Sequence, residues 1–358
     1  MPHDQADKKK TYAILLLFGG LGYIYIVLLL NFIVNPFEIF NTNFFKYNGA
    51  VQERYSKIEH LKTHTDFEVF LLGSSRVGTI DPIEASQILK KGVYNFYVSS
   101  GNQYDNLTHT KWLINHYKNL KSIYIQIDWP ESYGPFKKNV LQYRHHPDIS
   151  NNNYINFIGD FLTDTSFAAF KFKFINNFIQ PGYYFYNRNI GNYAYPSRDH
   201  ALLTDCQGYV DTVPDYRIAV PESARSVRQL GLNRDSLVAL SEIVEISAKN
   251  NIELKLFITP HHYKYLNSIN LEEYTQFLFE LSQITSFWTF AMYSDITGDN
   301  CNYYESSHYR PIVTNEIFNR LIVNSSDENV RYITASNAAQ QIRSIQDNFL
   351  MHRNILAN

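Results

Sequence analysis

The sequence predicts an α/β protein whose parallel sheet is covered by helices on both faces, preceded by a single membrane-spanning helix. Two patterns support this prediction. From about residue 66 to 324, short apolar runs alternate with stretches of helical periodicity, which is typical of parallel sheets. Before them, residues 12–34 form one long apolar run without a charged side chain.

The N-terminal apolar run is long enough to cross a bilayer. Residues 12–34 would span roughly 34 Å as a helix, and the hydrocarbon core is about 30 Å thick. A core helix of this length normally has a polar face, so we expect an anchor. Lys8, Lys9 and Lys10 precede the run, and the positive-inside rule places residues 1–11 in the cytoplasm and the rest outside. Asn35-Pro36-Phe37-Glu38 follows instead of an Ala-x-Ala site, so we expect no signal-peptide cleavage.

The elements after the anchor are expected in the following order. Residues 35–65 are polar and aromatic and are interpreted as a stalk. We expect strands at residues 67–72, 93–98, 122–127, 254–259 and 287–292, and helices at residues 103–117, 232–248, 271–284 and 312–323.

Two segments lie outside this alternation. Residues 130–230 are rich in Asn, Tyr and Phe without a clear period, and they are interpreted either as an insertion packed beside the sheet or as a cap or partner-docking subdomain. Residues 325–358 are expected to form a polar tail with a short helix near 338–350.

The composition excludes several classes of protein. Lys and Arg number 32 against 34 Asp and Glu, giving a net charge of −2, which argues against a nucleic-acid binder. The 28 Tyr and 25 Phe argue against disorder over most of the chain. Two cysteines without CxxC spacing exclude a cysteine-rich zinc module and a disulfide-framework miniprotein, while a Cys206–Cys301 bond remains open in an oxidising compartment.

A serine that follows the first expected strand is the main catalytic candidate. Gly73 allows a sharp turn, and Ser75 would lie at the start of the next helix, where backbone N–H groups can stabilise an oxyanion. A serine there is more often only a helix cap. Near the other end of the chain, however, Glu305 lies three residues before His308. A carboxylate at this spacing can hold the imidazole Nδ1–H while Nε2 faces the serine, as in a catalytic triad.

Other polar residues are weaker candidates. Arg76 could bind a phosphate or carboxylate of a substrate, or form an ordinary salt bridge, including one to Asp128. His261 or His262, at the end of the fourth expected strand, could line the same site, although surface or turn positions are commoner for such histidines. His145-His146 lacks carboxylates at metal-ligand spacing, so we expect no metal site there, and the triad chemistry requires no cofactor.

Three blocks resemble the SGNH/GDSL hydrolase superfamily, in particular its membrane-anchored envelope branch, which includes DltD-like and polysaccharide O-acetyl transfer proteins. They are Gly73-Ser74-Ser75, the segment from Val93-Tyr94-Asn95-Phe96 to Ser100-Gly101-Asn102, and Glu305-Ser306-Ser307-His308. The resemblance runs from about residue 67 to 323, with 130–230 outside it.

The resemblance implies a three-layer, flavodoxin-like α/β/α domain at residues 66–324 and a serine esterase or acyltransferase that acts on a cell-envelope glycan or lipid-linked substrate. Ser75 would be the nucleophile. The protein would be a single-pass protein of the bacterial inner membrane with a periplasmic or extracellular domain.

Two departures from the family pattern bear on activity. The third block usually supplies an Asn that donates to the oxyanion, but Asp128 stands there, and an ionised Asp cannot donate. The oxyanion hole would then rely on the N–H groups of Ser75 and Gly101, with the Asn102 amide as a further donor. Glu305 replaces the usual Asp, a known variation of triads. The alternatives are a catalytically weak accessory protein of a membrane-bound O-acyltransferase and a flavodoxin-like binding domain.

Overall fold

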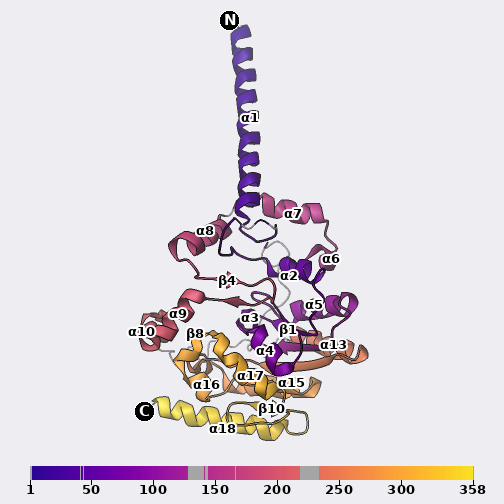
Figure 1. The fold of residues 1–358 in the computed structure, drawn as a ribbon, viewed down its shortest axis with the longest axis vertical. Coiled ribbons are helices and arrows are strands. Elements are labelled where there is room, and N and C mark those ends of the chain that lie inside the picture. Colours follow the sequence, from indigo (N-terminus) through magenta and orange to yellow (C-terminus); the bar gives the residue numbers. More distant parts are fainter. Residues whose placement is uncertain are drawn as a thin grey trace. The chain divides into compact units, whose positions relative to one another are not determined.

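A six-stranded sheet is the central feature of the computed structural model, which describes residues 2–40, 42, 44–127, 141, 144–165, 167–217 and 234–357 (Figure 1). The strand order is β10-β7-β6-β3-β1-β2, and β10 alone in this sheet runs antiparallel. The prediction of an α/β protein with a parallel sheet is confirmed, except that the edge strand β10 is antiparallel. The strands are β1 (Val69–Gly73), β2 (Val93–Tyr97), β3 (Ser122–Gln126), β6 (Glu253–Ile258), β7 (Phe287–Thr289) and β10 (Arg331–Ile333).

The strands are apolar because helices cover both faces of the sheet. The side chains of Val69 to Leu72 are fully buried, as are those of Ile123, Ile125 and Phe257. On one face, α4 (Pro82–Leu89) packs against α17 (Thr314–Leu321). Along the other face lie, each packed against the next, α5 (Gln103–His116), α13 (Arg234–Lys249), α15 (Leu271–Ile284) and α18 (Ala338–Ala357). The chain moves along the sheet in one direction from β1 to β2 and in the opposite direction from β2 to β7. Because parallel strands are joined by right-handed crossovers, this reversal places α4 on one face and α5, α13 and α15 on the other.

The chain divides into two compact units. The first comprises Met1–Ser56 and Lys138–Tyr184, and the second comprises Lys57–Lys137 and Phe185–Asn358. The division falls within α2 (Glu53–Leu61). The first unit contains α1 (Pro2–Val34), α6 (Pro147–Ser150), α7 (Tyr154–Leu162), α8 (Ala168–Phe174) and the π-helix η2 (Ile175–Ile179).

The second unit holds the sheet and several short elements besides the helices already given. These are α3 (Ser75–Gly78), β4 (Phe185–Tyr186), β5 (Tyr193–Ala194), α9 (Pro196–Thr204), α10 (Cys206–Thr212), α11 (Pro214–Arg217), α14 (Tyr263–Asn267), α16 (Asp295–Gly298), η3 (Asn300–Asn302), β8 (Tyr303–Glu305), β9 (His308–Tyr309) and η4 (Pro311–Val313).

Three segments differ from the sequence-based expectation. The stalk is not an isolated linker, because Phe37, Ile39 and Tyr55 form a buried cluster with Phe157, Phe161 and Ala169. The 130–230 insertion is shared between the two units rather than forming one cap. The polar tail supplies the edge strand β10 and the long helix α18, which packs on α15. Each difference arises from long-range packing, which local periodicity does not report.

The helix α1 is long and apolar enough to cross a membrane over Lys9–Val34, in agreement with the expectation for residues 12–34. Its large apolar side chains, such as Leu16 and Phe18, are exposed to more than half of their area. A surface of this kind is costly in water and requires an apolar environment.

A disulfide joins Cys206, at the start of α10, to Cys301 in η3, and the chain has no further cysteine. The two residues lie 95 positions apart in sequence, and their Cα atoms are 5.8 Å apart. The bond therefore links α9–α10 to the segment that precedes β8.

Reduction of this disulfide should lower the free energy of unfolding by about 2–4 kcal/mol, because the unfolded chain regains the entropy of a long loop. Thermal unfolding of the detergent-solubilised full chain, with and without reductant, measures the loss. The double variant Cys206→Ser/Cys301→Ser should behave as the reduced protein does and show no response to reductant. Titratable thiols in the untreated protein would contradict the bond.

Candidate active site

The turn between β1 and α3 presents Ser75 at the carboxyl end of the sheet. Gly73 has a φ of +150°, and a Cβ there would lie 2.6 Å from Gln126 Oε1, so glycine is required. Ser74 is the N-cap of α3, and Ser75 is its first residue. The turn thereby places the Ser75 side chain beyond the strand end, where open parallel sheets bind their ligands.

Two amide side chains from the strands that flank β1 hold this turn in place. Gln126 Oε1 at the end of β3 accepts hydrogen bonds from the Ser74 N–H (2.9 Å) and from the Ser74 hydroxyl (3.1 Å). Asn95 in β2 donates from Nδ2 to the carbonyls of Val77 (2.7 Å) and Ile80 (3.2 Å). Both amides are buried, so the position of Ser75 is fixed by groups that cannot exchange readily with water.

The hairpin β8–β9 supplies the carboxylate and the imidazole. Glu305 and His308 are directly paired across the two antiparallel strands, with Ser306 and Ser307 in the turn. Cross-strand partners project from the same face, which is why a spacing of three residues brings these side chains together. Glu305 Oε1 accepts a hydrogen bond from His308 Nδ1. The Ser307 hydroxyl lies 3.2 Å from the same oxygen.

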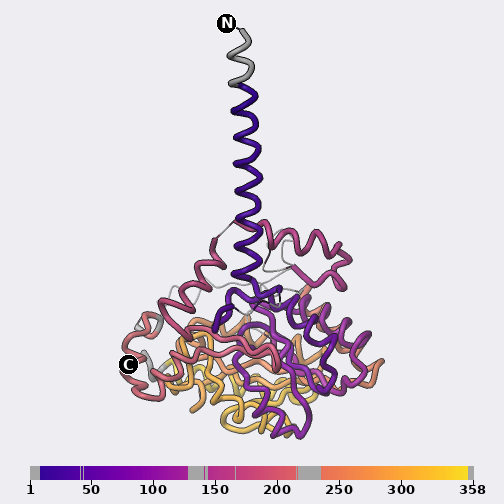
Figure 2. Tube along the Cα trace, turned by 45° about the horizontal axis from the view of Figure 1, so that its top comes forward, coloured from indigo at the N-terminus to yellow at the C-terminus, as the bar shows by residue number. Residues whose placement is uncertain are grey.

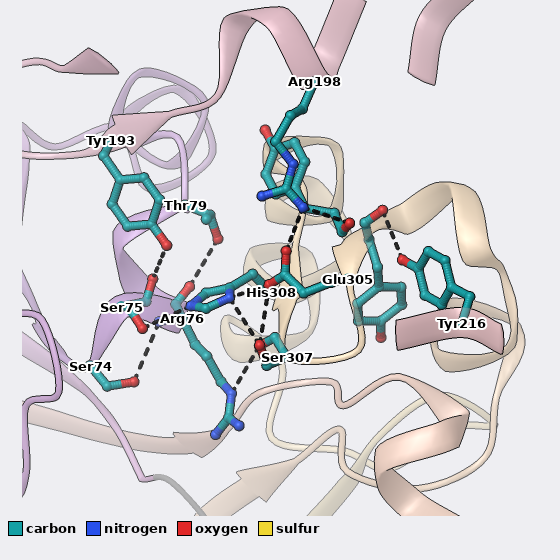
Figure 3. Close-up of polar contacts among 12 residues, drawn as sticks. Ser74, Ser75, Arg76, Thr79, Tyr193, Arg198, Tyr216, Glu305, Ser307 and His308 are labelled. Carbon is teal, nitrogen blue, oxygen red and sulfur yellow. Dashed lines mark hydrogen bonds and ion pairs between the residues drawn. The ribbon is translucent and has the colours of Figure 1, made fainter. Parts of the chain in front are cut away.

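Ser75, His308 and Glu305 form one hydrogen-bonded series (Figure 3). Ser75 Oγ lies 2.9 Å from His308 Nε2. Because Glu305 accepts from Nδ1–H, Nε2 carries the lone pair and accepts from the Ser75 hydroxyl. The distance and the tautomer are those of a nucleophile beside its general base. These three residues were expected from the sequence, and the fold brings them together although Ser75 lies far from Glu305 and His308 along the chain.

Arg198 is a component of this site that the sequence analysis missed. Its Nη2 donates to Glu305 Oε2 (2.5 Å) and to the Tyr304 carbonyl (2.7 Å), and its Nε donates to the Tyr209 hydroxyl (2.7 Å). Its guanidinium also lies between the rings of Tyr195 and Tyr304, 4.8 and 4.9 Å from their centroids. Figure 3 shows Arg198 and His308 on opposite sides of the Glu305 carboxylate.

These contacts keep Glu305 ionised. Burial alone would raise the pKa of its carboxyl, but the hydrogen bonds and charges of His308 and Arg198 outweigh burial and lower the pKa from 4.5 to about 2. An ionised carboxylate is purely an acceptor, so it holds the Nδ1–H tautomer of His308 in place.

The segment that carries Arg198 is bound to the hairpin by further contacts. Asp199 accepts from Arg310 Nε (3.0 Å) and from the Tyr304 hydroxyl (2.5 Å). The Cys206–Cys301 bond joins the same two regions. Closer to the nucleophile, the Tyr193 hydroxyl donates to the Ser75 carbonyl (2.8 Å). Residues 193–199 thus belong to the site, although their aperiodic sequence gave no signal of it.

The expected oxyanion donors at Ser75, Gly101 and Asn102 differ in the hydrogen bonds that these residues already make within the protein. The Ser75 N–H has no acceptor among the residues that the structure describes. The Gly101 N–H, in contrast, donates to the Val98 carbonyl at 2.8 Å, so an oxyanion would have to share it. Asn102 is buried and caps α5, its Oδ1 accepting from the N–H groups of Tyr104 and Asp105. Asp128 lies outside the described residues.

The remaining candidates differ in their environment. Arg76 donates from Nε to the Ser307 carbonyl (3.0 Å), and its guanidinium lies 5.2 Å from the centroid of the Tyr265 ring. His261 and His262 are both buried, which corrects the expectation of surface positions. Burial, followed by the charge of Arg76, places the pKa of His261 well below its ordinary value of 6.5. His262 Nε2 lies 2.7 Å from Asn300 Oδ1.

The described part of the chain shows no group of three or more His, Cys, Asp or Glu side chains that could hold a metal ion. His146, one of the pair considered for metal binding, caps α6 in the first unit by accepting from the Asp148 N–H at 3.0 Å.

No protein-family model matches the chain, and no curated protein is significantly similar to it in sequence. These comparisons therefore assign the chain to no family.

Replacement of Arg198 by alanine should raise the pKa of Glu305 and weaken the fold. In the wild type, the folded-state pKa of about 2 lies below 4.5, so ionised Glu305 stabilises the fold above about pH 4.5, and this contribution is lost as the pH falls toward 2. We expect Arg198→Ala to lose about 1–3 kcal/mol near neutral pH and to change less than the wild type on acidification. Thermal unfolding in detergent across this pH range tests the prediction.

Two further variants serve as controls. Arg198→Lys retains the charge without the planar fork and should fall between the wild type and Arg198→Ala. Arg320→Ala removes an arginine from a pair with Glu316 and Asp327 and should keep the wild-type response to acid, since it does not contact Glu305. Parallel pH profiles for Arg198→Ala and the wild type would refute the proposed role of Arg198.

Proposed function

We propose that the chain is a membrane-anchored serine esterase or acyltransferase of the SGNH type that works through an acyl-serine intermediate. The hydrogen-bonded series Ser75–His308–Glu305 carries the proposal. It has the three roles of a triad: a hydroxyl nucleophile, a neutral imidazole base and an ionised carboxylate that orients the base. No cofactor is required for this chemistry.

The position of the series in the fold supports this class. Numbered along the chain, the five parallel strands have the order 2-1-3-4-5 of doubly wound, flavodoxin-like sheets. The nucleophile follows the first of these strands, where the order reverses and ligands usually bind. The blocks that resemble the SGNH family include this turn and the hairpin that bears Glu305 and His308.

In the proposed mechanism, Ser75 Oγ attacks the carbonyl carbon of an ester while His308 Nε2 takes the hydroxyl proton. The Ser75 N–H stabilises the oxyanion of the tetrahedral intermediate. Collapse of the intermediate breaks the ester C–O bond, and the imidazolium returns its proton to the leaving alcohol, which produces acyl-Ser75. A second hydroxyl, from water or an acceptor, then gives its proton to His308 and attacks the acyl group, which regenerates the serine.

The proposed substrate is an acylated glycan or a lipid-linked precursor of the cell envelope, and the proposed location is the bacterial inner membrane with the second unit on the periplasmic or extracellular side. Lys8 to Lys10 lie in α1 just before its apolar run at residues 12–34, which fits a cytoplasmic N-terminus. The Cys206–Cys301 bond fits an oxidising compartment on the other side.

A second candidate function is a catalytically weak accessory protein that acts beside a membrane-bound O-acyltransferase. The observation in its favour is that the Gly101 N–H already donates to a carbonyl of its own turn. Asp128 also replaces the usual amide donor. Loss of one oxyanion donor can cost about 2.7–4 kcal/mol of transition-state stabilisation. A site with a triad but a poor oxyanion hole would bind substrate and turn it over slowly.

A fluorophosphonate probe should label the purified full chain on Ser75, because the probe reacts only with a serine activated by a base. Labelling is measured by in-gel fluorescence, and the modified residue is identified by peptide mass spectrometry. Ser75→Ala should lose the label, whereas Ser74→Ala retains the nucleophile and should remain labelled. An unlabelled wild type, or equal labelling of Ser75→Ala, would exclude the covalent mechanism.

Hydrolysis of a small aryl acetate should separate the two candidate functions. For an enzyme, we expect turnover that His308→Ala reduces by a factor of about ten thousand or more. His200→Ala removes an exposed histidine of α9 and should leave the rate unchanged. A wild-type rate no higher than that of His308→Ala would favour the accessory role.

A further inference from the structure

The first unit carries a set of exposed apolar side chains that its own fold does not cover. They come from α7, α8, η2 and the segment before residue 47, and they are between 49% and 80% exposed. Single exposed apolar residues are normal on protein surfaces, but a concentration in one small unit marks an interaction surface. We call this set the collar: Phe44, Ile155, Phe167, Phe174, Phe178 and Ile179.

Part of the collar is a stripe along α8 and η2. Lys171, Phe174 and Phe178 recur at intervals of three and four residues, which places them on one helical face, and Phe167 is the N-cap of α8. The rings of Phe174 and Phe178 are 5.1 Å apart, and the ring of Phe45 meets that of Phe178 at 6.1 Å. Lys171 is exposed within the stripe. Aromatic rings interleaved with lysine are typical of helices that lie in a bilayer interface.

The helix α7 adds an apolar surface of a different kind. Its inner face contributes Phe157 and Phe161 to the buried core of the unit. Its outer face carries Ile155, which is 80% exposed. Asn156 and Asp160 are its polar side chains. The exposed residues of α7 are Tyr154, Ile155 and Asn156, so Ile155 is the side chain that α7 adds to the collar.

Both helices are fixed at the level of the last turns of α1 (Figure 1). Asn31 donates from Nδ2 to the carbonyls of Leu162 and Asp164, each at 2.8 Å, so the link between α7 and α8 lies against α1. Val27 and Leu30 line a small cavity together with Phe167 of the collar. Figure 2 shows the chain around α7 and α8 spreading outward from this end of α1.

The length of α1 determines how deep in a bilayer its last turns, and the helices bound to them, would lie. The apolar section Lys9–Val34 has 26 residues. It would extend about 39 Å, roughly 9 Å more than the hydrocarbon core of a bilayer. If the N-terminal lysines mark one surface, the last turns of α1 reach the opposite interface, where aromatic and lysine side chains are favoured.

We propose that the collar inserts into the bilayer interface at the C-terminal end of α1, so that the first unit is a lipid-docked platform and not a solvated stalk. The partner is the lipid surface itself, with the aromatic rings at the headgroup level and Lys171 directed to lipid phosphates. The proposal rests on α1 as a membrane span and does not depend on the activity of the second unit. Docking through all four segments of the collar would restrict the tilt of the first unit on the membrane.

Depth-dependent quenching in nanodiscs that hold one chain each tests the proposal. Both native cysteines are paired, so a single introduced cysteine gives one site for a fluorophore. Ile155→Cys and Phe178→Cys report on the collar. Leu21→Cys in α1 is the reference for the bilayer interior. Leu203→Cys on α9, 74% exposed in the second unit, is the matched control for an exposed apolar position.

We expect lipids brominated near the headgroup end of the acyl chain to quench the probes at 155 and 178 at least about twofold more than the probe at 203. Lipids brominated near the methyl end should quench the probe at 21 most strongly. Collar probes quenched no more than that at 203 would overturn the proposal, whether they are solvated or shielded by protein. A probe at 21 that is not quenched would overturn it as well, because α1 would then not span the bilayer.

Discussion

The partly buried carboxylate of Glu305 is the constraint on which the candidate site depends. A charge removed from water is tolerated only where donors replace the lost hydration. His308 and Arg198 supply these donors to its two oxygens. The hydrogen bonds that stabilise this one carboxylate therefore fix both the tautomer of the His308 imidazole and the position of α9, which carries Arg198. The Asp199–Arg310 pair and the disulfide hold the same two segments at other points.

Ser75 is positioned by buried side chains of the central sheet, which are separate from the residues that hold Glu305. β1 lies between β2 and β3, and each of these neighbours contributes one buried amide, Asn95 and Gln126, to the turn that presents Ser75. Sites held by strands of a central sheet move less than sites held by loops. The hairpin β8–β9 meets this turn at two points, through His308 Nε2 at the Ser75 hydroxyl and through the Ser307 carbonyl, which accepts from Arg76 Nε.

The apolar helix and the candidate site lie in different units. The first combines an apolar helix with a compact cluster built from residues that precede β1 and residues that follow β3 in sequence. The second contains every residue of the candidate site. This division explains why a near-neutral net charge is sufficient: the proposed substrate shares the membrane with the anchor, so long-range electrostatic attraction is not needed.

The sequence by itself determined the features that depend on local patterning. Period and apolar content predicted the apolar section of α1 and the five parallel strands to within a few residues, and the spacing of Glu305 and His308 on a turn indicated their pairing. Arg198, Tyr193, the edge strand β10 and the packing of residues 35–56 were decided by the tertiary structure. Nothing in the aperiodic stretch around Arg198 marks it out. Only the fold places it 2.5 Å from the partly buried carboxylate of Glu305, 107 positions away in sequence. Contacts over such separations depend on the whole core, and no local property of the chain reports them.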